Sequence, residues 1–93
     1  MQALVHASPS GISLTTLRRR DIAAEQVRRV HLYTDPNGDQ GIVVRNSLFR
    51  YVYIPSEHLS DPQVAAGVRS LVDRVRNRAT VDAQVDTLLR SVA

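Results

Sequence analysis

The side chains in this sequence that could do chemistry are aromatic rings and guanidinium groups near its middle. All four aromatic residues lie between positions 33 and 53. If residues 48–54 form a strand, alternate side chains share a face, which brings Phe49, Tyr51 and Tyr53 together. Aromatic rings flanked by guanidinium groups can stack on nucleobases or hold an extended partner. The alternative is that these rings belong to the hydrophobic core, and that only the tyrosine hydroxyl groups reach its edge.

These residue types define a candidate binding surface on a sheet. Arg45 and Arg50 flank the aromatic residues, and Arg28 and Arg29 lie near the start of the strand expected over residues 27–34. The second face of the strand over residues 48–54 is largely apolar, so we expect cover on both of its faces, from helices or from a second subunit. The residues that we expect to form the binding surface are Arg28, Arg29, Arg45, Arg50, Tyr51 and Tyr53.

A second group of arginines is a candidate for binding nucleic acid. Its members are Arg18, Arg19, Arg20, Arg28 and Arg29. Clustered guanidinium groups bind phosphate, and such binding weakens steeply with salt. Asp21 and Glu25 lie between the two parts of the group and would partly neutralise it. A solvated edge strand is therefore the alternative interpretation of these residues.

Other chemistries find little support in the sequence. Cys is absent, which excludes thiol nucleophiles, disulfides and thiolate zinc sites, and no glycine-rich phosphate loop is present. Glu57, His58 and Asp61 could ligate a divalent metal, but their place before an expected helix favours capping and surface roles. A Ser-His-Asp triad has no supporting motif. We expect no enzyme, no cofactor and no metal site.

Length and composition are those of one globular domain over residues 1–93, with 43% hydrophobic and 23% charged residues. The net charge is +3, and residues 1–50 hold the surplus, with seven Arg against four acidic residues. Such a surplus attracts nucleic acid, anionic lipid or an acidic partner, or it serves solubility. No stretch is typical of a secretory signal or a membrane-spanning helix, which predicts a cytoplasmic protein.

The C-terminal third predicts two amphipathic helices over residues 61–92. Ser60 is the expected N-cap of the first helix, Asn77 its exit, and Thr80 the N-cap of the second. One long helix is the alternative, because no Gly or Pro separates the two apolar stripes. Gly67 lies on the apolar side, where it would allow a close backbone approach. The stripes are Val64, Val68, Leu71, Val72 and Val75, then Val81, Val85, Leu88, Leu89 and Val92.

Residues 1–55 predict an antiparallel sheet of about five strands, because β-branched and aromatic residues alternate with turn residues. Between two of the strands, residues 35–39 carry Pro and Asn-Gly, which suit a tight reversal. The packed helices would cover the sheet, which makes the fold class α+β. The expected strands lie at residues 4–8, 12–17, 27–34, 41–46 and 48–54.

The first 25 residues also admit helices, with Ser13 and Asp21 as caps. Two helices followed by a hairpin would make a winged-helix DNA-binding protein that uses residues 13–29 as its reader and Asn46-Ser47 as its wing tip. We favour strands, because Ile12 and the two threonines that follow suit a pleated surface better than a helix.

The run GISLTTLRRRDIAAEQVRRVHLY over residues 11–33 is followed by Val43-Val44-Arg45 and by Tyr53-Ile54-Pro55 before a helix. This pattern resembles the strand core of small bacterial pleckstrin-homology-like domains. The chain departs from that family in having fewer than seven expected strands and two final helices instead of one. The resemblance implies a scaffold for protein–protein contact or assembly, without catalytic residues.

We therefore expect a non-enzymatic binding or assembly module that acts through its sheet surface. Its expected partner is a protein, which includes a second copy of the chain in a homo-oligomer. A nucleic-acid-binding protein of the winged-helix type is the alternative.

Overall fold

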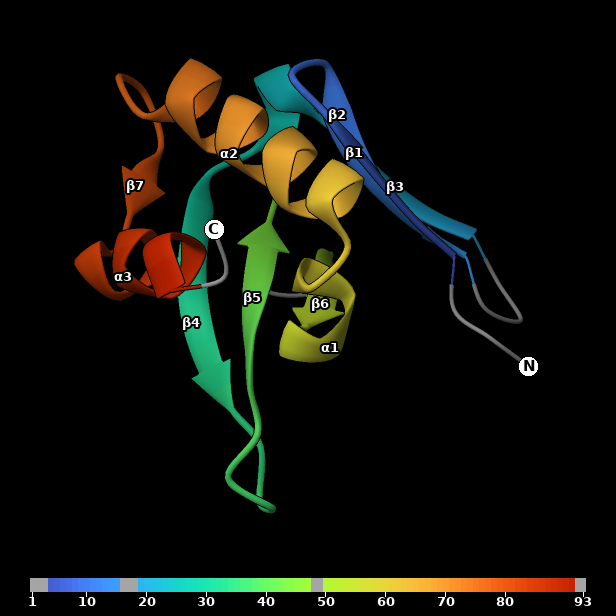
Figure 1. Ribbon diagram of the computed structural model, residues 1–93. Coiled ribbons are helices and arrows are strands. Elements are labelled where there is room, and N and C mark those ends of the chain that lie inside the picture. The colour runs from blue at the N-terminus through green and yellow to red at the C-terminus, as the bar shows by residue number, and fades with distance from the viewer. Residues whose placement is uncertain (1–3, 16–18, 48–49, 92–93) are drawn as a thin grey trace.

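The structure is a computed structural model that describes residues 4–15, 19–47 and 50–91. The architecture is α+β, as predicted, and Figure 1 shows helices packed against two groups of strands. The elements are β1 (Leu4–Ser8), β2 (Gly11–Thr15), β3 (Arg19–Ala23), the 3-10 turn η1 (Ala24–Gln26), β4 (Arg29–Thr34), β5 (Gln40–Arg45), β6 (Tyr51–Pro55), α1 (Ser56–Leu59), α2 (Pro62–Val75), β7 (Thr80–Val81) and α3 (Ala83–Ser91).

The strands form two sheets instead of the single sheet of about five strands that the sequence predicted. The first is antiparallel, in the order β1-β2-β3, and the second has the order β6-β5-β4-β7, in which β7 runs parallel to β4. The prediction missed β3 because its sequence, Arg-Arg-Asp-Ile-Ala, shows only one large apolar residue. It missed β7 because the two residues of that strand read as the beginning of a helix.

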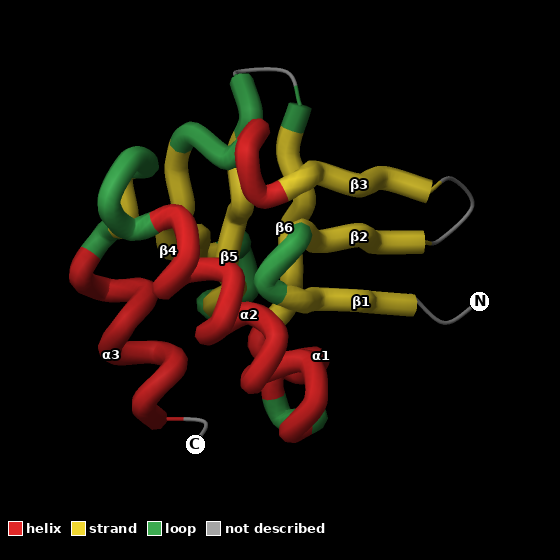
Figure 2. The backbone as a smooth tube through the Cα atoms, turned by 90° about the horizontal axis from the view of Figure 1, so that it is seen from above, coloured by secondary structure: helices red, strands yellow, loops and turns green. Residues whose placement is uncertain are grey.

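The hydrophobic core lies between the two sheets and the helices. The inward side chains of β4, β5 and β6 meet Ile12 and Ile22 of the first sheet in one cluster. β6 lies against β2 and β3, while α2 packs along β1 (Figure 2). The apolar stripe predicted for the first helix is confirmed, since Val64, Val68, Leu71, Val72 and Val75 are all buried.

The two helices predicted for the C-terminal third are confirmed as separate, but their caps differ from the prediction. Asp61, and not Ser60, is the N-cap of α2, because its carboxylate accepts a hydrogen bond from the Gln63 amide at 2.9 Å. The chain leaves α2 after Val75. Thr80 does not cap α3, because it lies in β7 and its amide donates to the Arg28 carbonyl at 3.0 Å.

Arginines of the C-terminal half hold the elements together through backbone carbonyls. Arg78 donates to the carbonyls of Ala24, Glu25 and Val27, which ties the turn after α2 to η1. Arg74 donates to the Pro9 carbonyl at 2.9 Å. A guanidinium with five donors suits such contacts to several carbonyls at once. These arginines therefore have a structural role that accounts for their positions.

Gly67 of α2 has the close backbone approach that the sequence predicted. A Cβ atom at this position would collide with the carbonyl group of Ala7 in β1. The helix can therefore pack onto the first sheet only because this position has no side chain.

Replacing Gly67 with alanine should lower the free energy of unfolding by about 1–3 kcal/mol, the cost of overpacking a rigid site. Alanine by itself would favour the helix by up to about 1 kcal/mol, so the collision decides the sign. Urea denaturation measures the change. Ser70→Ala, at an exposed position of the same helix, is the control and should leave stability nearly unchanged. A Gly67→Ala variant as stable as the original chain would contradict the close approach.

Arg76 and Asp86 join the end of α2 to α3. The guanidinium donates to both carboxylate oxygens of Asp86, at 2.9 and 2.7 Å. The hydrogen bond from Arg76 lowers the pKa of the Asp86 carboxyl below its ordinary value of 3.8. Because the folded pKa is lower than the unfolded one, the stabilisation is present above about pH 4 and is lost as the pH falls through the folded pKa.

Asp86→Asn should therefore lower the free energy of unfolding at neutral pH by about 0.5–1 kcal/mol. The effect is small because Arg76 is partly exposed and solvent screens the ion pair. The difference from the original chain should shrink in acid, below the pKa of the folded carboxyl. Urea denaturation of both chains, at neutral pH and in acid below that pKa, checks this. Asp73→Asn, which removes a 3.6 Å contact between Arg76 and a 77% exposed side chain, is the control and should have a smaller effect.

Candidate binding surface

The outer face of β4, β5 and β6 carries the aromatic and arginine residues that the sequence singled out. Val30, Val44 and Val52 pair across the three strands and are buried toward the core. Side chains alternate along a strand, so the residues between them point outward. We call the outward residues the outer face; its rows across the strands are Arg29, Arg45 and Tyr51, then His31, Val43 and Tyr53, then Tyr33, Gly41 and Pro55.

Arg45 is held in place by its neighbours on this face. Its guanidinium carbon lies 4.9 Å from the centre of the Tyr51 ring, a cation–π distance. Its Nε donates to Nε2 of His31 at 3.3 Å, while Nδ1 of His31 lies 3.3 Å from the Leu32 carbonyl. Only the neutral imidazole with its proton on Nδ1 satisfies both contacts. The arginine therefore has one defined orientation between an imidazole and an aromatic ring.

Gly41 makes room for the ring of Tyr53. A Cβ atom at Gly41 would lie 2.5 Å from Cε1 of Tyr53 and 2.6 Å from the Ile54 carbonyl oxygen. The Tyr53 ring thus lies over the middle strand, and the Tyr33 ring meets it edge to face with centroids 5.6 Å apart. Such aromatic pairs add about 0.5–1.5 kcal/mol beyond the area that they bury.

Two of the tyrosines of the outer face are open to solvent. Among the described residues, Tyr33 at 46% and Tyr51 at 37% are the exposed large hydrophobic side chains. Val52 and Ile54 make the core of β6. The interpretation as a core residue is wrong for Tyr51, which is exposed, while Tyr53 is half-buried on the same outer face. Helices of this chain leave Tyr51 exposed on this face of β6, and cover by a second subunit, the other form of the expectation, stays a prediction.

A hollow of about 260 Å³ lies at the end of the outer face opposite the arginines. Asp35, Asp39 and Glu57 line it beside Tyr53. Asp35 also builds the predicted turn, because its carboxylate accepts from the amides of Asn37 and Asp39 at 2.9 Å each. Burial raises the pKa of Tyr53 above its ordinary value of 10.0, and negative charge on Asp35, Tyr33, Asp39 and Glu57 raises it further.

Four of the six predicted binding residues lie together on the outer face, namely Arg29, Arg45, Tyr51 and Tyr53. Arg29 is paired with Asp82 at 3.0 Å. Arg28 is exposed and lies just before β4. Arg50 turns toward the other sheet, because its guanidinium donates to the Asp21 carbonyl at 3.2 Å.

Sequence reasoning missed Tyr33, Gly41 and the contact between His31 and Arg45. The alternation of Arg29, His31 and Tyr33 along one strand could have placed them on one face. Their neighbours on β5 depend on the register, which the sequence does not reveal.

Three of the five arginines in the second group lie on strands, Arg19 and Arg20 in β3 and Arg29 in β4. β2 and β3 occupy residues 11–15 and 19–23, where the winged-helix alternative requires helices. Arg18, like Phe49, lies outside the described residues. The described part of this segment therefore lacks the reading helix that the winged-helix alternative requires.

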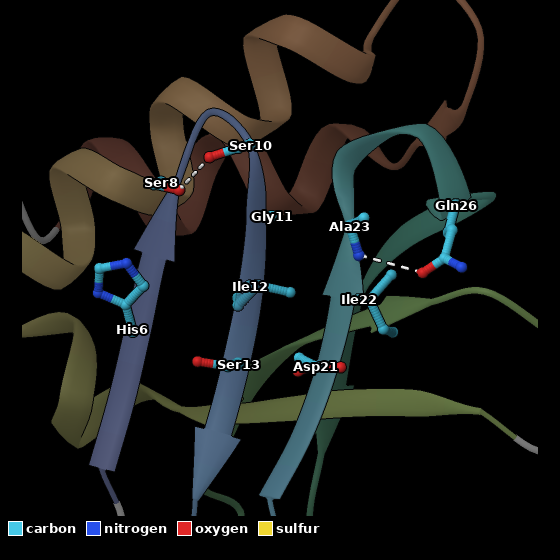
Figure 3. Close-up of a pocket in the computed structure, with 10 residues that line it drawn as sticks. All are labelled: His6, Ser8, Ser10, Gly11, Ile12, Ser13, Asp21, Ile22, Ala23 and Gln26. Atoms are coloured by element: carbon cyan, nitrogen blue, oxygen red, sulfur yellow. Dashed lines mark hydrogen bonds between the residues drawn. The ribbon is translucent and has the colours of Figure 1, made fainter.

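A second hollow, of about 360 Å³, lies on the first sheet (Figure 3). His6, Ser13 and Asp21 pair across its three strands in a single row. Ser13 stands between the other two, whereas a nucleophilic triad needs the histidine between the serine and the carboxylate. Within the described ranges, no three His, Asp or Glu side chains are grouped closely enough to hold a metal ion.

No protein-family model, curated protein or solved structure matches the chain. The resemblance to pleckstrin-homology-like domains therefore stays a prediction. None of the helices in the described parts of the chain is both long enough and apolar enough to cross a membrane.

The raised pKa of Tyr53 can be tested in a Tyr33→Phe, Tyr51→Phe double variant, in which Tyr53 is the sole tyrosine. Its phenol should ionise above pH 10.0, because burial and the nearby carboxylates oppose the phenolate charge. Ultraviolet absorbance of tyrosinate against pH measures this. Adding Glu57→Gln should shift the transition toward lower pH, whereas Asp73→Asn, on α2, should not. Ionisation at or below the ordinary value would contradict the arrangement of the hollow.

Proposed function

We propose that this chain is a non-enzymatic binding module that holds a protein partner on the outer face of β4, β5 and β6. The observation that carries the proposal is the exposure of Tyr33 and Tyr51 on the face where Arg45 stacks against a ring. Tyrosine and arginine are enriched in protein interfaces and among the residues that dominate their binding energy. Exposed aromatic rings that share one ordered face are suited to that role.

The fixed positions of the side chains on the outer face support the proposal. Arg45 is fixed by His31 and Tyr51, and the Tyr53 ring is fixed by the space over Gly41. A partner that binds such a face does not need to immobilise these side chains, so less entropy is lost on binding. The buried row beneath them keeps the strands rigid.

The charges of the face favour a protein over a nucleic acid. Three carboxylates, from Asp35, Asp39 and Glu57, line the hollow at one end. They would repel a phosphate backbone, whose binding requires a continuous basic groove. At the other end Asp82 offsets the charge of Arg29. The resemblance stated above implies the same class of function, a scaffold for protein contact.

Site-specific photo-crosslinking in living cells tests the proposal. A photoreactive phenylalanine analogue replaces Tyr33 or Tyr51, and, as a control, Thr87, which is exposed on α3. We expect protein crosslinks from the first two positions and none from the control. Crosslinks that nuclease removes would support a nucleic acid instead. No crosslink from the face, or equal crosslinking from Thr87, would overturn the proposal.

Tyr51→Ala should reduce the affinity for the crosslinked partner by about tenfold or more, the effect of losing an aromatic residue that anchors an interface. The reduction is measured by titrating purified partner against the original chain and the variant. Ser70→Ala, at an exposed position of α2, is the control and should bind like the original chain. An unchanged affinity of Tyr51→Ala would place the contact elsewhere.

A further inference from the structure

The two ends of the outer face carry opposite charges. Arg29 and Arg45 belong to the row at one end, where Asp82 offsets the charge of Arg29 and Arg45 supplies the net positive charge. Carboxylates line the hollow at the other end, and the described lining contains no basic side chain. A complementary partner must therefore present carboxylates opposite the arginines and a guanidinium or ammonium group opposite the hollow.

A second copy of this chain meets that requirement. When two outer faces meet about a twofold axis that runs across the strands, strand direction is reversed between the copies. The arginine end of each copy then lies against the carboxylate end of the other. An interface of this kind is isologous, so each favourable contact occurs twice.

We infer, on the basis of the proposed function, that this chain forms a symmetric dimer through its outer faces, with Arg45 of each copy facing the acidic hollow of the other. The axis passes through the middle row, at His31, Val43 and Tyr53. Arg45 lies two residues to one side of Val43, and Gly41 lies two residues to the other. The axis therefore sets Arg45 over Gly41 of the second copy, against the Tyr53 ring that occupies the space above this glycine. A guanidinium against an aromatic ring is a favourable cation–π contact.

The remaining positions are also compatible with this arrangement. The guanidinium of Arg45 lies over the ring of Tyr51 in β6, and the hollow lies between the start of β5 and the end of β6. The guanidinium and the hollow are therefore both on the β6 side of the outer face. Tyr33 falls opposite Arg29 of the second copy, a cation–π pairing. Tyr51 falls opposite Pro55, an apolar contact. Both exposed tyrosines are thus covered.

The area of the face predicts a weak dimer. Three strands of about five residues span roughly 15 by 20 Å. This is less than the roughly 800 Å² that each partner buries in a stable complex, so association should be in the range of transient complexes. Because contacts between exposed charges are screened, added salt should weaken it.

Sedimentation equilibrium of the purified chain, over a wide range of concentration, tests the inference with two charge-reversal variants. Arg45→Glu and Asp39→Arg should each weaken self-association by about tenfold or more, because like charges meet twice in each homodimer. An equimolar mixture of the two should regain the association of the original chain, since both contacts then join opposite charges. Asp73→Arg, on α2, is the control and should associate like the original chain.

A chain that stays monomeric at every concentration would overturn the dimer, and so would a mixture that fails to recover. These results are separable from failure of the proposed function. Photo-crosslinks from positions 33 and 51 to a different protein, with a monomeric purified chain, would overturn the dimer and leave the binding face standing. Absent crosslinks from both positions would remove the binding face itself.

Discussion

The structure depends on the burial of one side of β4, β5 and β6. Val30, Val44 and Val52 form a row with almost no exposed surface, and Ile42 and Ile54 extend it. A shift of one residue in any of these strands would turn valines to solvent and bring arginine or tyrosine into the core. The cost of that exchange fixes the register. It also fixes, on the opposite side, which arginine meets which tyrosine.

Two glycines allow close approaches that this arrangement requires. Gly67 lets α2 lie on β1, which brings the helix and the first sheet into one core. Gly41 lets the Tyr53 ring lie over β5. The first contact closes the core, and the second shapes the outer face. Both positions lack a side chain because another group of the chain occupies that space.

Part of the fold and site followed from local pattern. Alternation predicted that Tyr51 and Tyr53 share a face, and helical spacing predicted the buried stripe of α2. β3 escaped prediction because Ile22 is the only large apolar residue among its five. β7 escaped because two residues carry no periodicity, and its pairing with β4 follows from where α2 ends. Arg50 was misplaced because its contact with Asp21 joins two different sheets.

The sequence by itself determined the class of fold, the apolar stripe of α2, the turn over residues 35–39 and the residue types of the outer face, since each depends on neighbours a few positions apart. Tertiary structure alone decided that there are two sheets, that Tyr33, His31 and Gly41 join the face, and that carboxylates gather at its far end. Those outcomes depend on contacts between segments distant in the chain. Such contacts are selected by the packing of the whole core, and no local pattern encodes them.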